Sequence, residues 1–163
     1  MYLAAFERLV AALPGACEQV YGPRLKSLAV FGSVARGTPR PDSDIDLLLV
    51  VDDLPAGRSA RMAEFDRVDA KLAPLLAQLR SEGVHTALSP VLKTPAELAA
   101  GSLLYLDMVD QARILVDDDG LLRRYLDDLG RRLAAMGARR VAKGGGYYWE
   151  LAPGFRWGDR IEL

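Results

Sequence analysis

Two short apolar runs, joined by a loop rich in glycine and proline, constrain the fold of this chain most strongly. Residues 25–31 and 45–51 have strand length and are bounded by turn residues, which is typical of buried β-strands. The second run, IDLLLVV, is apolar on both faces, so we expect it at the centre of a sheet. The stretch VARGTPRPDS between the runs predicts a short helical turn and then a loop.

Helical patterns alternate with short strand patterns along the rest of the chain. We expect helices over residues 2–20, 58–80, 94–110 and 119–136, and further strands over 84–92 and 112–118. Pro14 is a candidate break in the first helix, and Pro74 should kink the second or start a new piece. Pro90 suggests an edge or bulge position for its strand. Asp119 is expected to cap the last helix, and the tail from Gly144 to form a hairpin or an extended cover.

Length and composition favour one domain over residues 1–163, with a motif core at 24–120 and a C-terminal helix and tail at 119–163. No stretch approaches the ~20 uncharged apolar residues that a membrane span needs, so we expect a soluble, cytoplasmic protein. The net charge of -1 gives no general attraction for nucleic acid. A local basic stretch at 121–143 is interpreted mainly as a solvated helix face, with binding of RNA or of an acidic partner as the lesser alternative.

Asp44 and Asp46 begin the second apolar run. Side chains at i and i+2 of a strand point to the same face, so the two carboxylates project together while Ile45 enters the core. Two adjacent carboxylates repel each other unless a positive charge lies between them. Carboxylate and water oxygens suit Mg²⁺ or Mn²⁺, and Mg²⁺ is commonly shared between protein carboxylates and substrate phosphates.

Gly32 and Ser33 end the first apolar run and open the helical turn. Glycine lets the backbone approach a ligand closely, and the N–H groups at a helix start suit phosphate. Ser33 adds a hydroxyl donor, while Arg36 and Arg40 on the same loop could steer an anion. These groups next to Asp44 and Asp46 predict a site for a metal-chelated nucleoside triphosphate.

The segment GSVARGTPRPDSDIDLLLV resembles the signature of nucleotidyltransferases of the DNA polymerase beta superfamily, which is Gly-Ser, a spacer and then Asp-x-Asp in a strand. It is most similar to the minimal nucleotidyltransferases, which are often paired with a HEPN-type ribonuclease toxin. The resemblance covers about residues 24–120 by element order and 31–50 by motif. It implies an α/β (α+β) fold with a mixed sheet flanked by helices. It also implies that Gly32 and Ser33 hold the triphosphate and that Asp44 and Asp46 hold two metal ions.

The chain departs from the family pattern at one point. Active members carry a third carboxylate on the next core strand, but the expected third strand, VHTALSPVL, contains no Asp or Glu. The weak candidates for this role are His85, Asp69 and Glu97. The departure leaves nucleotide binding as the expectation and leaves the catalytic activity open.

Three functions follow from these residues and the resemblance. The first is Mg²⁺-dependent transfer of a nucleoside monophosphate, AMP from ATP, to a protein or RNA acceptor. The second is an antitoxin-like partner of a HEPN-type ribonuclease with weak or no catalysis. The third, nucleotidyl transfer to an aminoglycoside, ranks low because the chain has no obvious drug-binding domain. The aromatic tail could pack within the chain or against a second subunit of a homodimer.

Overall fold

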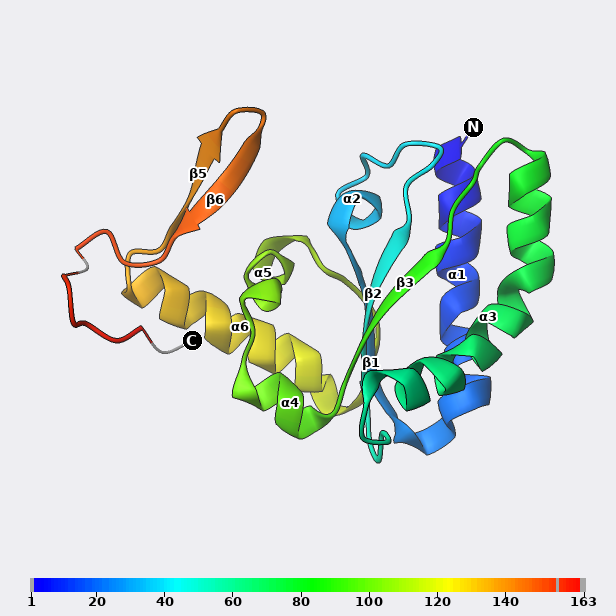
Figure 1. Ribbon diagram of the computed structural model, residues 1–163, viewed down its shortest axis with the longest axis horizontal. Coiled ribbons are helices and arrows are strands. Elements are labelled where there is room, and N and C mark those ends of the chain that lie inside the picture. Colours follow the sequence, from blue (N-terminus) through cyan, green and yellow to red (C-terminus); the bar gives the residue numbers. More distant parts are fainter. Residues whose placement is uncertain (1, 155, 162–163) are drawn as a thin grey trace.

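A four-stranded mixed sheet forms the centre of the computed structural model, which describes residues 2–154 and 156–161 (Figure 1). Its strands lie in the order β3-β2-β1-β4. Their bounds are β1 Leu25–Phe31, β2 Ile45–Val51, β3 Leu88–Lys93 and β4 Arg113–Asp117. Strand β1 pairs antiparallel with β2 and β4, while β2 and β3 run parallel. The mixed sheet and the central place of β2 confirm what the sequence and the family resemblance predicted.

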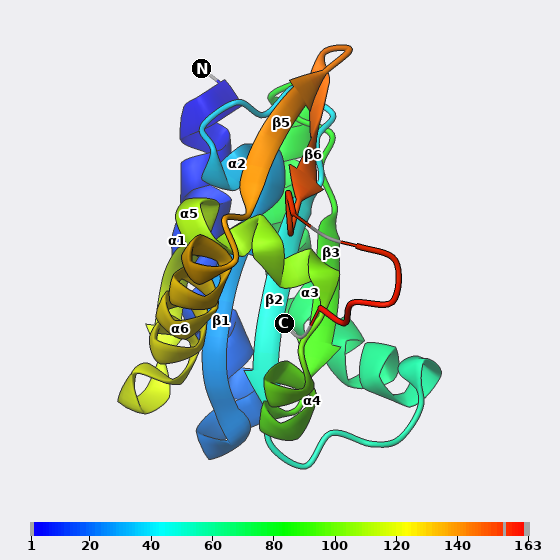
Figure 2. The ribbon, with the colours of Figure 1, turned by 90° about the vertical axis from the view of Figure 1, so that its left-hand side faces the viewer.

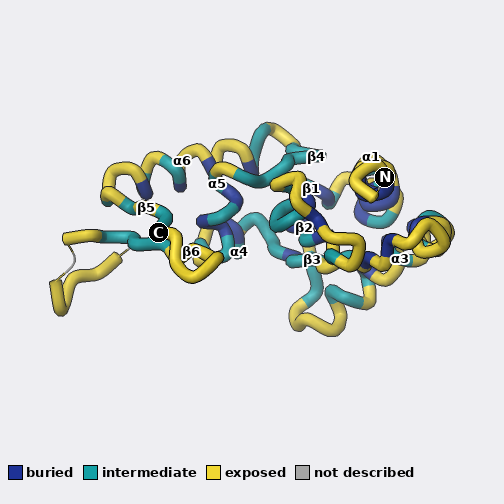
Figure 3. Tube along the Cα trace, turned by 90° about the horizontal axis from the view of Figure 1, so that it is seen from above, coloured by how far each residue is buried: buried dark blue, intermediate teal, exposed yellow. Residues whose placement is uncertain are grey.

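Helices cover both faces of this sheet. The long helices α1 (Tyr2–Tyr21) and α3 (Arg58–Ser81) lie on one face, and α4 (Pro95–Ala100), α5 (Met108–Gln111) and α6 (Leu121–Ala135) lie on the other (Figure 2). Successive β2 side chains alternate between the two cores: Leu47 and Leu49 pack with α1 and α3, and Leu48 and Val50 with the α6 side. Seen from above, the buried trace follows the strands and the inward faces of the helices (Figure 3).

The two prolines inside long helices do not divide them. Helix α1 runs unbroken through Pro14, although proline removes one backbone hydrogen bond. Buried residues on both sides, Leu13 and Cys17, pack into the same core and hold the helix together across the gap. Helix α3 likewise contains Pro74, and its ribbon bends within the helix, which agrees with the predicted kink (Figure 1).

The expected helix over 94–110 is wrong in its length. The predicted cap is present, because Thr94 and Glu97 form a reciprocal capping box at the start of α4. Helix α4 ends before Gly101, whose φ of 85° leaves the helical region, and two short turns, one of them α5, follow. The expected cap at Asp119 is also wrong. The carboxylate of Asp117 instead accepts hydrogen bonds from the N–H groups of Leu122 and Arg123 at 2.8 and 2.9 Å. Asp119 has a left-handed backbone with a φ of 51°, which is not the extended conformation typical of a helix cap.

A separate two-stranded hairpin, β5 (Arg139–Lys143) and β6 (Gly146–Glu150), follows α6. The hairpin expected in the tail is therefore confirmed, although its first strand lies in the basic stretch. Arg139 pairs with Glu150 across the hairpin, and Arg140 pairs with Asp110. No helix among the described residues is long and apolar enough to cross a membrane. The cytoplasmic location stays a prediction.

Candidate active site

The start of α2 (Gly32–Ala35) lies against the start of β2. Phe31, the last residue of β1, is the antiparallel partner of Asp46, so Gly32 follows directly beside that carboxylate. Gly32 has a φ of 70°, and a Cβ built on it would lie 2.2 Å from Oδ2 of Asp46. Glycine is therefore required twice, once by the backbone conformation and once by the close approach of Asp46. The glycine and the second aspartate of the motif form one structural unit.

Asp44 and Asp46 lie at the same end of β2. Asp46 has the same side-chain parity as Leu48 and Val50, so it projects toward the sheet face that α6 covers further along the strand. Asp44 is exposed, and its Oδ1 accepts the Ala87 N–H at 3.2 Å, which fixes it to the segment before β3. Burial and the charge of Asp44 raise the pKa of the half-buried Asp46 carboxyl, while Arg36 opposes the shift.

This donor set fits a divalent cation. Burial and, after it, the like charge of Asp44 raise the pKa of Asp46, and a cation between the carboxylates would favour the ionised form. Two carboxylates that leave positions for water and phosphate oxygens match the usual coordination of Mg²⁺. No group of three His, Cys, Asp or Glu side chains suited to a metal ion occurs within residues 2–154 and 156–161. The remaining ligands would have to come from water and substrate.

The residues expected to contact phosphate gather at the same place. Ser33 is half-buried in the first turn of α2, and Phe31 caps this turn with no side-chain hydrogen bond among the described residues. Arg36 is exposed at the end of α2, close enough to Asp46 to influence its pKa. Arg40 lies further along the loop and pairs with Asp42 at 3.6 Å, so it is less suited to a ligand. The structure thus brings together Gly32, Ser33, Arg36, Asp44 and Asp46.

Ser89 of β3 occupies a position from which a carboxylate would reach the site of Asp46. Ser89 is the parallel register partner of Asp46, and it is exposed. The neighbouring residues show which face it occupies, because Val91 packs with the core of Leu48 while Leu88 and Leu92 pack with the opposite core. Ser89 therefore shares the face of Asp46. Sequence reasoning did not single out this residue, because the pairing register of β2 and β3 is not visible in the sequence.

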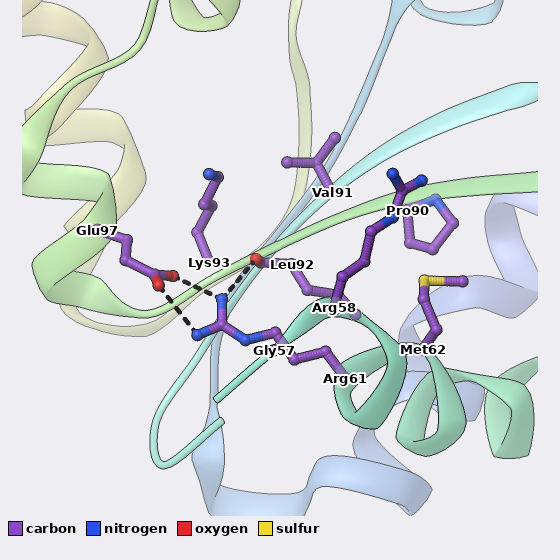
Figure 4. Close-up of a pocket in the computed structure, with 9 residues that line it drawn as sticks. All are labelled: Gly57, Arg58, Arg61, Met62, Pro90, Val91, Leu92, Lys93 and Glu97. Atoms are coloured by element: carbon purple, nitrogen blue, oxygen red, sulfur yellow. Dashed lines mark hydrogen bonds and ion pairs between the residues drawn. The ribbon is translucent and has the colours of Figure 1, made fainter. Parts of the chain in front are cut away.

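The three weak candidates for a third acidic or basic group lie elsewhere or stay unassigned. Glu97 accepts two hydrogen bonds from Arg61, at 2.7 and 2.9 Å (Figure 4). It also accepts one from the Thr94 N–H at 2.9 Å. Asp69 lies on α3, where burial and the charge of Asp66 raise the pKa of the Asp69 carboxyl. His85 is closer to the aspartates, because its backbone N–H donates to the Pro41 carbonyl at 2.8 Å. Its side chain is exposed, and its role as a base stays a prediction.

A cavity of about 520 Å³ lies at the other end of β3 rather than at the aspartates. Arg61 and Glu97 close one side of it, and Pro90, Leu92 and Met62 supply apolar walls (Figure 4). The Arg61 guanidinium also donates to the Leu92 carbonyl at 3.2 Å, so it covers part of the free edge of β3. The cavity and the unpaired carboxylates therefore indicate different places for the functional site. We favour the carboxylates, because Asp44 and Asp46 can bind a cation, whereas Glu97 is already paired with Arg61.

Comparison with known proteins agrees with this geometry. The family described as the nucleotidyltransferase domain matches residues 12–98, just over half of the chain. A protein of Methanocaldococcus jannaschii named "Putative protein adenylyltransferase" is 32% identical over 113 residues, which is 68% of this chain and 71% of that protein. These two matches show the family: this chain belongs to the nucleotidyltransferases.

Solved structures of toxin–antitoxin complexes are also similar to this chain. A complex with AMP-PNP has a TM-score of 0.45 and 18% identity over 81% of this chain and 92% of that one. A complex of the tri-AMPylated Shewanella oneidensis HEPN toxin with an MNT antitoxin has a TM-score of 0.42 and 16% identity, over 83% and 91% of the two chains. Both TM-scores are below 0.5, so these structures add nothing to the family assignment.

Proposed function

We propose that this protein is a Mg²⁺-dependent nucleotidyltransferase that moves AMP from ATP to a hydroxyl group of an acceptor protein. The observation that carries the proposal is the pair Asp44 and Asp46, two carboxylates on one strand face with no basic partner in the described part of the chain and with Gly32 against one of them. Acidic pairs used only for structure are normally neutralised within the fold. This pair is instead positioned to be neutralised by a cation that arrives with a nucleotide.

The residues of the site divide the work of binding. Gly32 and Ser33 offer backbone N–H groups and a hydroxyl to the triphosphate, and the Arg36 guanidinium offers a positive charge beside them. Asp44 and Asp46 would hold the divalent cation, which when bound neutralises charge on the attacked phosphate and on the departing pyrophosphate. The acceptor hydroxyl oxygen then bonds to the α-phosphorus and its proton passes to water. The bond from that phosphorus to the bridging β-phosphate oxygen breaks, and pyrophosphate leaves with that oxygen.

A protein acceptor is supported by the M. jannaschii relative, whose printed name is that of a protein adenylyltransferase. The family resemblance suggests a HEPN-type protein as the partner, and both proteins would then meet in the cytoplasm. An RNA acceptor is less favoured, because the net charge is -1 and two of the basic side chains of the hairpin are already paired with acids.

A second candidate function is an antitoxin-like partner that binds a HEPN-type protein with little or no catalysis. The observation in its favour is Ser89, which occupies the strand position beside Asp46 where a carboxylate would complete a three-acid site. A hydroxyl there is a weaker ligand for a hard cation than a carboxylate.

Transfer of labelled AMP from α-labelled ATP distinguishes the two functions. Purified protein would be incubated with Mg²⁺ and with a candidate HEPN-type protein, and compared with the Asp44→Asn/Asp46→Asn variant. Label on the partner that is lost in the variant would support the enzyme. A stable complex of the two proteins without label would support the second candidate, and label that persists in the variant would contradict both roles of the aspartates.

A further inference from the structure

The C-terminal hairpin is tied to the body of the protein through its inner face. The Trp149 indole N–H donates to the Asp107 carboxylate at 3.0 Å, and the Arg140 guanidinium donates to Asp110 at 3.3 Å. Both acids lie in the segment just before β4, on the sheet face that α6 covers. The hairpin stands outside the main sheet and rises to the level of α2 in both ribbon views (Figures 1 and 2). It therefore has a fixed attachment and a free end.

The two faces of the hairpin differ in composition. Pairing of Arg140 with Trp149 and of Ala142 with Tyr147 places these residues on the inner face, while Tyr148 lies on the opposite face. The Arg140 guanidinium lies 5.1 Å from the Tyr147 ring centre and 5.2 Å from that of Trp149, which is cation–π distance. Trp149 is half-buried, but Tyr147 is 42% exposed. One ring of the cluster is thus held by Arg140 and still open to a ligand.

The hairpin and the candidate active site lie on the same side of the sheet, because Asp46 projects toward the face that α6 covers and the hairpin is tied to that face at the level of α2 (Figure 2). Burial and the nearby Asp107 raise the pKa of the Tyr147 hydroxyl, and the positive charges of Arg140 and Arg36 oppose that shift. The charge of Arg36 therefore reaches the hairpin, which agrees with this placement. A ligand bound at Asp46 would lie on the sheet face that the hairpin flanks, where the ring of Tyr147 is exposed.

We propose that Tyr147, held in place by Arg140 and Trp149, stacks on the base of the bound nucleotide. This proposal rests on the nucleotidyltransferase function proposed above and adds the binding site for the base. A nucleotide combines an anionic chain with a flat aromatic group, and Arg36 and Tyr147 offer the two matching chemistries at the same level of the molecule. Stacking on an aromatic side chain tolerates every base, since each base has a π-face.

The chain offers a matched control for this proposal. Tyr147 and Tyr148 are neighbours in β6 and are 42% and 47% exposed, but they lie on opposite faces of the hairpin. Binding of ATP and of inorganic triphosphate, each with Mg²⁺, would be measured by calorimetry for the wild type and for Tyr147→Ala, Tyr147→Phe and Tyr148→Ala. Inorganic triphosphate has no base, so it reports the phosphate and metal contacts alone.

Tyr147→Ala is expected to weaken ATP binding about tenfold or more while triphosphate binding stays unchanged. Tyr147→Phe should keep ATP affinity within about twofold, because the ring carries the stacking, and Tyr148→Ala should bind both ligands like the wild type. Unchanged ATP binding in Tyr147→Ala would overturn the proposal, even if transfer to an acceptor fell, since the hairpin would then serve the acceptor. Equal loss of both ligands would also overturn it. Absence of triphosphate binding in the wild type would overturn the proposed function as well.

Discussion

Asp46 and Glu97 lie near opposite ends of β3 and have opposite electrostatic surroundings. Glu97 is surrounded by donors, and hydrogen bonds from Arg61 and from the Thr94 backbone lower its pKa to about 2. Asp46 instead faces Asp44, and burial together with this like charge raises its pKa. A paired carboxylate stabilises the protein by itself. An acid kept beside another acid stabilises only a complex with something positive, and this difference identifies the functional pair.

The largest effect that tests this comparison is expected for Asp46→Asn. Loss of one metal-binding carboxylate should lower AMP transfer on the order of 10³-fold, since metal-ion stabilisation of the transition state contributes several kcal/mol. The free energy of unfolding should stay unchanged or rise, because the repulsion from Asp44 disappears. Rates from labelled ATP and unfolding curves in urea would measure both quantities. Asp42→Asn, an exposed loop carboxylate paired with Arg40, is the matched control, and an equal loss of activity there would refute the comparison.

Gly32→Ala should have the next largest effect. The new Cβ would overlap the Asp46 carboxylate, so we expect transfer to fall about 10²-fold as that group is displaced from its productive position. Gly37→Ala provides the control, because Gly37 has a similar φ of 72° but open space around its Cβ position. Both variants should lose about 1 kcal/mol of stability from the left-handed backbone. Equal activity of the two variants would show that the contact between Gly32 and Asp46 has no role.

Ser89→Asp would add a third acid to the unpaired carboxylates Asp44 and Asp46 and so increase their difference from the paired Glu97. A third carboxylate beside Asp46 should tighten Mn²⁺ binding about tenfold, because hard cations prefer carboxylate oxygens over a hydroxyl. Titration followed by electron paramagnetic resonance would measure the affinity. Ser89→Asn has nearly the same shape without the charge and should bind Mn²⁺ like the wild type. Identical affinities for Ser89→Asp and Ser89→Asn would mean that this position does not face the metal.

The smallest effect is expected at the paired acid. Glu97→Gln should cost about 1–2 kcal/mol of stability at neutral pH through the weakened capping box and ion pair, with AMP transfer unchanged. The pKa of Glu97 is depressed in the folded state, so its contribution is present above about pH 4.5 and is lost as the pH falls toward 2. The wild type and the variant should therefore converge in stability at acid pH. A variant that stays less stable by the same amount at pH 2 would contradict this.

Asp46 should give the opposite pH dependence. Its pKa is raised in the folded state, so protonation favours folding and the stabilising effect appears as the pH falls through that pKa. Metal binding needs the ionised form and should release a proton, which titrations in buffers of different ionisation enthalpy would detect. A heat of metal binding that does not change with the buffer would show that no proton is released, and this would contradict the raised pKa of Asp46.

Local patterns in the sequence predicted the parts of the site that local chemistry controls. Strands 25–31 and 45–51 follow from apolar runs, and the face of Asp46 follows from the two-residue period of a strand. The placement of Asp44 on the same face stays a prediction, because Asp44 precedes the strand. The contact of Gly32 with Asp46 and the position of Ser89 depend on pairing between strands, which no local pattern fixes. Helix α4 ended earlier than its periodicity suggested, because Gly101 adopts a positive φ. The attachment of the hairpin to the sheet face from which Asp46 projects joins segments about a hundred residues apart and needed the folded structure.

Metal-dependent binding of ATP to the wild type and to Asp44→Asn/Asp46→Asn tests the central claim most directly. Calorimetric titration with ATP in the presence of Mg²⁺, and again with EDTA, would be compared for the two proteins. The account predicts binding by the wild type that requires Mg²⁺ and that is lost in the double variant, which should remain folded. Binding of equal strength by the double variant in Mg²⁺ would show that the two aspartates do not form the nucleotide site.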